Sequence, residues 1–330
     1  MRIAIIGAGA VGGSIAALLD RSGHDVEVTA RGEHLAAIRE QGLQLTGAWG
    51  DHRAHVEANP TVTKAPDLAI VTTKAPDAPA ALRENARWLH GIPVLVVQNG
   101  LDALSNAHSV VHDSDVVGGL AVYAASYVSP GSVAVTTAGP IYLGNAESSL
   151  AVEYVAGVLG AAMPVTVIHN FTGAQWTKLI VNQINALPAI TGLSAQQAIA
   201  QPKLRRILTE SMREAVGVAL AQGVRFAALQ GLSHRALRLF HLLPTGVAQL
   251  LPLIMKWRMG HTPNPGSTLQ SVRRGQKTEI DYLNGAVVNA GKANSVSTPI
   301  NAALVAMVHE VERTGVFLST DDVVARALAR

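Results

Sequence analysis

The feature that most constrains the fold is a glycine-rich turn that follows a short apolar run near the start of the chain. Residues 2–6 read Arg-Ile-Ala-Ile-Ile, which predicts a buried strand, and residues 13–21 are typical of a helix. Between them lies a G-x-G-x-x-G pattern formed by Gly7, Ala8, Gly9, Ala10, Val11 and Gly12. After a strand and before a helix, this pattern is typical of a Rossmann unit that binds a dinucleotide pyrophosphate, and the alternative is a glycine turn without a ligand. We expect all six residues to contact the cofactor.

The end of the second predicted strand distinguishes NAD from NADP. NAD enzymes usually carry an acidic residue at the tip of this strand, where it binds the ribose 2′-hydroxyl. Here the strand covers residues 26–29, Glu27 lies inside it, and Arg31 follows it. An arginine in this position can bind a 2′-phosphate through charge-assisted hydrogen bonds, whereas the alternative is a surface arginine. We therefore predict NADP(H) as the cofactor.

Two further predicted strands end in polar residues. The apolar runs 68–72 and 94–97 are followed by Lys74 and Asn99. Ligands of open α/β sheets bind at the carboxyl edge of the strands, so we expect both residues to contact the cofactor and Asn99 to contact the substrate as well. The alternatives are a solvated lysine and an ordinary Asn-Gly turn.

The chain changes character along its length, which predicts two domains. Strands alternate with helices at first, and the runs 119–127, 131–137 and 140–143 then predict strands that extend the sheet at its edge. A helix is expected at 149–162 and a last strand at 164–168, after which helical patterns dominate. The predicted class is α/β, with an N-terminal Rossmann-type dinucleotide-binding domain at residues 1–170 and a C-terminal all-helical domain at residues 171–330.

A polar stripe on an apolar helix is the first candidate for catalysis. Lys178, Asn182 and Asn185 lie at positions i, i+4 and i+7 of a helix expected at 176–187, so they share one face. Buried polar side chains need partners, and a polar substrate could supply them. The alternative is a solvent-facing stripe.

A second helix is expected to begin at Ser267, where Ser267-Thr268-Leu269-Gln270 is typical of a capping box, and to continue through Gly285. In that helix Lys277 would be a surface partner of Asp281, whereas Glu279 would have no basic residue one turn away.

These motifs, in this order, resemble the ketopantoate reductase (2-dehydropantoate 2-reductase) family over nearly the whole chain. The resemblance also includes Thr73-Lys74, Gln98-Asn99-Gly100 and the run Thr278-Glu279-Ile280-Asp281-Tyr282. It implies NADPH-dependent reduction of 2-dehydropantoate to (R)-pantoate, in the pathway to pantothenate and coenzyme A.

The resemblance also implies residue roles. Lys178 would be the general acid and Glu279 would orient or tune it. Asn99 and Asn182 would place the substrate and the nicotinamide. Ser267, joined by Asn264, would bind the substrate carboxylate or hydroxyl.

Three departures from the family pattern lie in the predicted substrate domain. The second helix asparagine of the family stands four residues beyond the first, whereas Asn185 stands three residues beyond Asn182. The acidic residue that usually follows the Leu-Gln pair is Ser271 here, and the segment 226–265 is longer and more apolar than in compact members. The alternatives are therefore a related reductase for a different ketoacid or hydroxy acid, and a non-catalytic NADP-binding sensor.

Composition excludes several other kinds of site. The chain has no cysteine, which excludes disulfides and thiolate chemistry and fits a cytoplasmic protein. With a net charge of +3 and scattered basic residues, it shows no nucleic-acid signature, and no metal-ligand pattern is present. The first residues do not resemble a signal peptide.

The apolar stretch 241–257 is broken by prolines and is too short to span a bilayer easily. We expect it to form buried helices or a partner-facing surface, and we predict a homodimer that acts on a small ketoacid, with no membrane partner.

Overall fold

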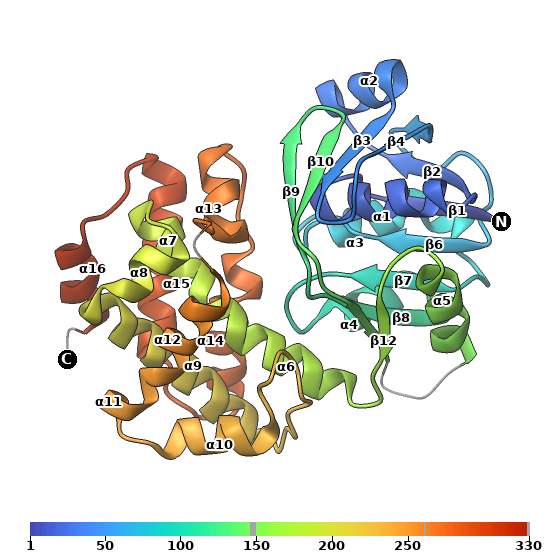
Figure 1. Cartoon of the computed structure of the whole chain (residues 1–330). Coiled ribbons are helices and arrows are strands. Elements are labelled where there is room, and N and C mark those ends of the chain that lie inside the picture. The colour runs from blue at the N-terminus through green and yellow to red at the C-terminus, as the bar shows by residue number, and fades with distance from the viewer. Residues whose placement is uncertain (146–149, 261, 329–330) are drawn as a thin grey trace. The chain divides into compact units, whose positions relative to one another are not determined.

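The computed structural model describes residues 1–145, 150–260 and 262–328 (Figure 1). The chain divides into two compact units, Met1–Phe171 and Thr172–Arg330. Both sheets lie in the first unit. In the described residues of the second unit the regular secondary structure is helical, apart from a single β-bridge between Leu229 and Leu232.

The main sheet of the first unit has the strand order of a doubly wound dinucleotide-binding fold. Among the described residues it contains eight strands, in the order β12 (Val165–Val167), β11 (Ile141–Gly144), β8 (Val116–Ala121), β7 (Val94–Val97), β6 (Leu68–Val71), β1 (Arg2–Ile6), β2 (Asp25–Thr29) and β5 (Glu57–Asn59). All neighbours from β5 to β8 are parallel, and β11 runs antiparallel to β8. The predicted Rossmann-type class is confirmed.

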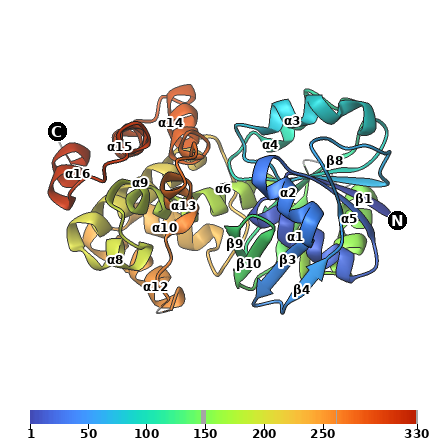
Figure 2. The ribbon, with the colours of Figure 1, turned by 90° about the horizontal axis from the view of Figure 1, so that it is seen from above.

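Both faces of this sheet are covered, which explains why its strands are continuous apolar runs. Figure 2 shows α3 (Ala78–Asn85) and α4 (Ala103–His108) on one side, and α1 (Ala10–Arg21) on the other. The 3-10 helix η1 (Ala86–Trp88) follows α3, while α2 (Gly32–Gln41) packs near β5 and α5 (Leu150–Gly160) near β12. Successive residues of β1 enter opposite cores, with Ile5 in one and Ile6 in the other.

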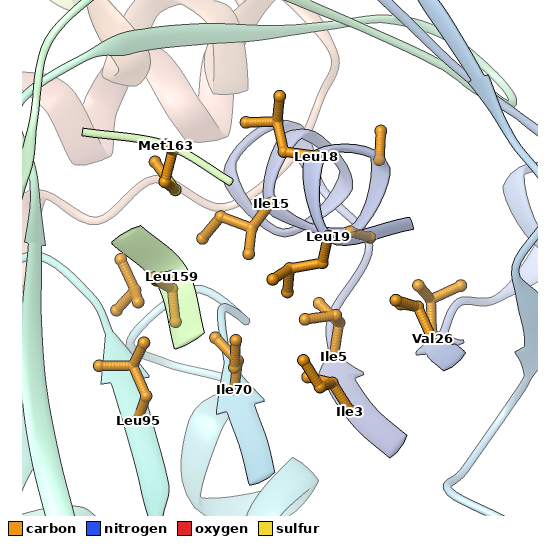
Figure 3. Close-up of a cluster of buried hydrophobic side chains, with 14 of the residues drawn as sticks. Ile3, Ile5, Ile15, Leu18, Leu19, Val26, Ile70, Leu95, Leu159 and Met163 are labelled. Carbon is orange, nitrogen blue, oxygen red and sulfur yellow. The ribbon is translucent and has the colours of Figure 1, made fainter. Parts of the chain in front are cut away.

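Helix α1 is buried on nearly all sides. Figure 3 shows Ile15 and Leu19 on the side of Ile5 and Ile70, whereas Leu18 lies on the opposite side of the helix. That opposite side is covered by a second sheet, in the order β4 (His52–Ala54), β3 (Leu43–Gly47), β10 (Ser132–Thr137) and β9 (Ala124–Ser129). The sequence predicted neither β3, β4 nor β5.

The single strand predicted at 119–127 is wrong. Strand β8 ends at Ala121 in the main sheet, and β9 begins at Ala124 in the second sheet. The chain changes direction in between because Tyr123 is buried: its hydroxyl lies 3.2 Å from Ser14 Oγ and its ring packs on Trp49. Only β8, β11 and β12 therefore extend the main sheet. The predicted helix at 149–162 corresponds to α5, and its first residue lies outside the described residues.

The second unit is built around one long helix. Its elements are α6 (Phe171–Asn182, which begins at the last residue of the first unit), η2 (Gln183–Asn185), α7 (Ala186–Thr191), α8 (Ala195–Ala200), α9 (Pro202–Ala221), α10 (His234–Leu242), α11 (Thr245–Ala248), α12 (Leu250–Arg258), α13 (Gly266–Arg273), η3 (Ile280–Tyr282), α14 (Asn284–Ala293), α15 (Pro299–Thr314) and α16 (Thr320–Ala327). Helix α9 contacts α8, α10, α11, α12, α14, α15 and α16, so it forms the centre of this unit.

Both helices that were expected to carry catalytic residues are interrupted. The helix predicted at 176–187 begins at Phe171 and tightens to 3-10 geometry after Asn182. The helix predicted from Ser267 to Gly285 ends at Arg273, where Gly275 takes a positive φ of 60°. A glycine in this conformation commonly ends a helix, because it carries no Cβ penalty there.

The helical spacing argument for Lys277 and Asp281 does not apply, because α13 ends at Arg273 and no continuous helix joins the two residues. Asp281 pairs with His309 of α15 at 2.9 Å.

Candidate functional site

Each of the three glycines in the glycine-rich turn is explained by a different feature of its surroundings. Gly7 has a φ of +104°, and a Cβ there would lie 2.9 Å from the backbone nitrogen of Thr73. A Cβ at Gly12 would collide with the carbonyl oxygen of Gly7 and with Thr72. At Gly9 a Cβ would meet nothing within 4 Å, and Gly9 is the N-cap of α1. The turn therefore leaves open space at a helix N-terminus, where an anion binds favourably.

The remaining residues of the pattern are arranged around this space. Ala8 is buried and joined to the end of β2 by a hydrogen bond from its N–H to the carbonyl of Thr29, at 2.9 Å. Ala10 and Val11 open the first turn of α1. The N–H groups of a first helical turn have no partners within the helix, so they suit a phosphate.

A histidine that the sequence analysis missed links this turn to the second sheet. The backbone N–H of Gly131 donates to His34 Nδ1 at 2.9 Å, so the other ring nitrogen carries the proton and Nε2 donates to the carbonyl of Ala8 at 2.7 Å. Burial lowers the pKa of His34 below its ordinary value, and the bond to Ala8 partly opposes this. The neutral imidazole thus joins the glycine turn to the β9–β10 turn. No local pattern marks His34, because its partners are distant in sequence.

Glu27 and Arg31 have different surroundings. The Glu27 side chain is fully buried, pairs with Arg2 at 3.0 Å, and accepts hydrogen bonds from Asn59 and Thr63. Arg31 follows β2, is exposed, and pairs with Glu84 of α3 at 2.6 Å. The Glu27 carboxylate is therefore occupied by partners within the fold, while the Arg31 guanidinium lies at the surface beside the end of β2.

The loops that carry Lys74 and Asn99 are joined to each other. They follow β6 and β7, which are parallel neighbours, so both lie at the carboxyl edge of the sheet. Gln98 Nε2 donates to the carbonyl of Thr73 at 2.8 Å, which links the two loops. Thr73 also lies against Gly7. Lys74 and Asn99 are half-buried and are thus brought to the same edge as the glycine turn.

Lys178 has the most perturbed environment of the predicted catalytic residues. Burial lowers the pKa of this lysine to about 8, and the negative charge of Glu279 partly opposes that shift. Glu279 lies just before η3, where its carbonyl accepts the N–H of Tyr282 and of Leu283. A lysine with a pKa near neutrality can donate a proton and still be mostly charged at pH 7.

The amides of Asn182 and Asn185 follow Lys178 along a helix that changes its geometry. In a 3-10 turn, side chains three residues apart lie one above the other, so the tightening after Asn182 keeps Asn185 on the same side. Asn182 is half-buried and Asn185 is buried. The spacing of three is thus matched by the backbone, which no helical-wheel argument could have shown.

Asn264 and Ser267 lie at the start of α13, beside Asn185. The predicted capping box is wrong, because Ser267 lies in the first turn and the helix begins at Gly266; instead, Asn264 Oδ1 accepts the N–H of Gly266 at 2.9 Å. The backbone of Asn264 is also bonded to Ala195 and Gln196 of α8. Ser267 is exposed. The structure therefore gathers Asn185, Asn264 and Ser267, three of the predicted substrate residues.

A buried polar network lies behind this part of the second unit, and sequence reasoning did not identify it. Asn284 Nδ2 donates to Gln183 at 2.7 Å and to Asn301 at 2.9 Å, and Asn301 donates to Glu214 at 2.7 Å. Ser211 joins the same network. Because Gln183 stands between Asn182 and Asn185, the network holds the point at which the helix changes geometry. These residues are scattered along the chain, so only the fold brings them together.

The described residues show neither a cluster of three or more metal-ligating side chains nor a helix long and apolar enough to cross a bilayer.

Comparisons with known proteins match both units of the chain. The family model described as "Ketopantoate reductase PanE/ApbA" matches residues 3–148, and its C-terminal counterpart matches residues 170–312. A 2-dehydropantoate 2-reductase of Pyrococcus abyssi is 29% identical over 310 residues, which covers 92% of this chain and 95% of that protein.

Solved structures show the same fold. A PanE/ApbA family ketopantoate reductase from Ralstonia eutropha is 29% identical with a TM-score of 0.80, and the match covers 95% of this chain and 99% of that one. D-Mandelate dehydrogenase, solved with NADH and anilino(oxo)acetate, is 23% identical with a TM-score of 0.83 over 95% of this chain and 99% of its own; at that identity the likeness concerns the fold alone.

Proposed function

Because the chain belongs to the ketopantoate reductase family, whose members are oxidoreductases, we propose that it reduces 2-dehydropantoate to (R)-pantoate with NADPH. This reaction leads to pantothenate and coenzyme A. The family membership counts against the sensor alternative. The proposal assigns the cofactor to the glycine turn, Arg31, Lys74 and Asn99, within residues 1–170. It assigns the proton donor and the substrate residues chiefly to residues 171–330.

The observation that carries the proposal is the environment of Lys178. NADPH, when bound, supplies the hydride that reduces the ketone carbon. The carbonyl oxygen would then become an alkoxide that needs one proton, and we assign its donation to the Lys178 ammonium. With a pKa of about 8, the lysine is charged at neutral pH and gives up its proton more readily than an exposed lysine. The negative charge of Glu279 helps to keep it protonated.

The choice of NADP rests on the contrast between Glu27 and Arg31. The Glu27 carboxylate is buried and already accepts hydrogen bonds from the fold, so it is poorly suited to bind a ribose 2′-hydroxyl. Arg31 is exposed and its guanidinium can exchange the Glu84 carboxylate for a 2′-phosphate. This exchange replaces one anionic partner with another of higher charge.

The substrate assignment rests on neutral hydrogen-bonding groups. We assign Asn99, Asn182 and Asn185 to the ketoacid because amides orient a carboxylate and a ketone without adding charge. Ser267 and Asn264 lie beside Asn185 and would bind the carboxylate or hydroxyl.

A second candidate is reduction of a different 2-oxo acid. The observation that favours it is Ser271, which stands where the resembled family has an acidic residue; it is buried and donates to the carbonyl of Ser267 at 3.2 Å.

The test is NADPH oxidation, followed at 340 nm with 2-dehydropantoate, in the wild type and in Lys178→Ala. We expect the variant to lose about 10²–10⁴-fold in kcat, since general acid catalysis contributes that much. Lys292→Ala, which removes an exposed lysine of α14, is the matched control and should behave as the wild type. NADPH binding, measured by fluorescence, should be unchanged in both variants.

Each outcome separates parts of the proposal. Turnover of 2-dehydropantoate that depends on Lys178 supports both the substrate and the acid. Tight NADPH binding without turnover of 2-dehydropantoate would reject this substrate, and a panel of 2-oxo acids would then identify the second candidate. Full activity in Lys178→Ala would reject Lys178 as the acid. We expect the activity in the cytoplasm, which cell fractionation would check.

A further inference from the structure

Helix α12 presents its apolar stripe to solvent instead of to the core. Leu250, Leu253, Ile254 and Trp257 are spaced as i, i+3, i+4 and i+7, the pattern that normally faces a protein interior. All four are exposed, and Trp257 is 81% exposed. The inward side of the helix is occupied by Pro252, which is buried. The apolar stripe of this helix therefore faces solvent, whereas such a stripe usually faces the protein core.

The neighbouring helices also carry exposed apolar side chains. Leu239 and Leu242 of α10 and Val247 of α11 are exposed as well, and Leu242 reaches 73%. Helices α10, α11 and α12 follow one another along one side of the second unit, where α11 packs on α12 (Figure 1). We refer to the exposed side chains of Leu239, Leu242, Val247, Leu250, Leu253, Ile254 and Trp257 as the α10–α12 surface.

The α10–α12 surface is held in this orientation by polar contacts on its inner side. Arg213 of α9 donates to Thr245 Oγ1 and to the carbonyl of His241, each at 3.0 Å. Arg205 of α9 donates to Gln249 at 3.1 Å. These half-buried bonds would be lost if the helices rotated, which opposes an inward turn of the apolar stripe.

The charges around the α10–α12 surface have the composition of a protein interface. No Asp or Glu occurs between Glu214 and Glu279 in the sequence. The charged residues within α10 and α12 are Arg235, Arg238, Lys256 and Arg258. Interfaces between proteins are enriched in Trp, Met and Arg and depleted in Asp, Glu and Lys.

The size of the α10–α12 surface fits a second copy of the chain. Added together, the exposed fractions of its seven residues equal about four fully exposed side chains. Four such side chains have on the order of 500 Å² of apolar area. A standard interface buries about 800 Å² per partner, of which roughly 450–520 Å² is apolar. One α10–α12 surface therefore supplies the apolar part of one side of such an interface.

We propose that the α10–α12 surface is the interface of a homodimer, in which the stripe of α12 packs against the same stripe of a second copy around a two-fold axis. In such an interface residue i of one copy contacts residue j of the other and the reverse, and only residues near the axis face their own equivalents. If the axis crosses the stripe at its centre, the residues in the middle of the stripe lie closest to it. Leu253 and Ile254 are in the middle of the stripe. The proposal is independent of the substrate and of the cofactor.

The first test measures mass by sedimentation equilibrium and light scattering at about 1–50 μM, a range that brackets typical dimer affinities. The double variant Leu253→Glu/Trp257→Glu places four like charges in the interface of a dimer, so we expect the wild type to be dimeric and the variant monomeric. Val316→Glu is the matched control, since Val316 is an exposed apolar residue outside the α10–α12 surface. Circular dichroism and thermal melting would show that the variants fold, as expected for exposed positions.

The second test uses the absence of cysteine from the chain. A single Ile254→Cys substitution should be crosslinked into dimers by a short bis-maleimide, whereas Val316→Cys should not. A monomeric wild type, or a wild-type dimer that survives Leu253→Glu/Trp257→Glu, would overturn the proposal. Flotation of a monomeric wild type with vesicles of phosphatidylserine and phosphatidylcholine would overturn it too, and would assign the surface to a bilayer.

Discussion

A Cβ atom at Gly266 would lie 2.5 Å from Oδ1 of Asn185, so the first residue of α13 and the last residue of η2 fit together only because one of them is glycine. Gly266 also has a φ of +69°. The contact joins two segments of the second unit that are about 80 residues apart in the sequence. It also sets the distance between Asn185 and the turn that carries Asn264 and Ser267.

Gly266→Ala should therefore damage substrate binding as well as stability. The left-handed conformation alone costs an alanine about 1–2 kcal/mol. Gly275→Ala is the control: it has the same conformational cost, since φ is +60°, but no clash, because a Cβ there meets nothing within 4 Å. We expect both variants to be less stable in urea unfolding, but only Gly266→Ala to raise the KM for the ketoacid. Equal KM values in the two variants would show that Asn185 does not contact substrate.

The pH dependence of the reaction should report the Lys178–Glu279 pair. Reduction needs the protonated lysine, so kcat/KM should fall as the pH rises past about 8. The charge of Glu279 raises the pKa of Lys178, and Glu279→Gln should therefore lower that pKa and move the alkaline fall to lower pH. Glu310→Gln, which removes a half-buried carboxylate paired with Arg326, is the control. An unshifted profile in Glu279→Gln would contradict the pairing.

Cofactor preference should depend on the Arg31–Glu84 pair. Arg31→Ala should raise the KM for NADPH by about 10–100-fold, since a hydrogen bond between charged groups contributes about 1.5–3 kcal/mol, and should leave the KM for NADH unchanged. Glu84→Gln removes the competing carboxylate and should lower the KM for NADPH. Arg83→Ala, one residue away on α3, controls for the loss of a positive charge. A parallel rise for NADPH and NADH in Arg31→Ala would argue against 2′-phosphate recognition.

NADPH binding should weaken in acid because of His34. The folded protein holds this imidazole neutral, and its pKa lies below the ordinary value of 6.5. A group with a lowered histidine pKa contributes its full stability above about pH 6.5 and loses it as the pH falls toward the folded pKa. Protonation puts a hydrogen on Nδ1, which then cannot accept the N–H of Gly131.

Two variants test this link. His34→Gln keeps a donor for Ala8, whereas His34→Phe keeps none, so titration of NADPH by fluorescence between pH 5 and 8 should give a larger rise in Kd for the phenylalanine variant. Neither variant should retain the acid sensitivity of the wild type. Wild-type affinity that is constant across this range would reject the role of His34.

The sequence by itself determined the first unit best, since local patterns there carry the information. A short apolar strand, glycines at defined spacing and a helix identify a doubly wound unit, because a buried parallel strand must be apolar on both faces. The ordered motifs also identified the family, and with it an oxidoreductase.

Only the tertiary structure decided the features that depend on contacts between distant segments. Tyr123 turns the chain from one sheet into another because its hydroxyl meets Ser14, which no local pattern marks. The change of helix geometry after Asn182 likewise depends on distant contacts. Gln183 accepts a hydrogen bond from Asn284, about 100 positions away. The stripe of α12 is the clearest case: its spacing is that of a core helix, yet the stripe is exposed while Pro252 is buried and Arg205 of α9 donates to Gln249 at the N-cap. Hydrophobic spacing predicts which face of a helix is apolar, and only the fold decides whether that face packs within the same chain or lies at the surface.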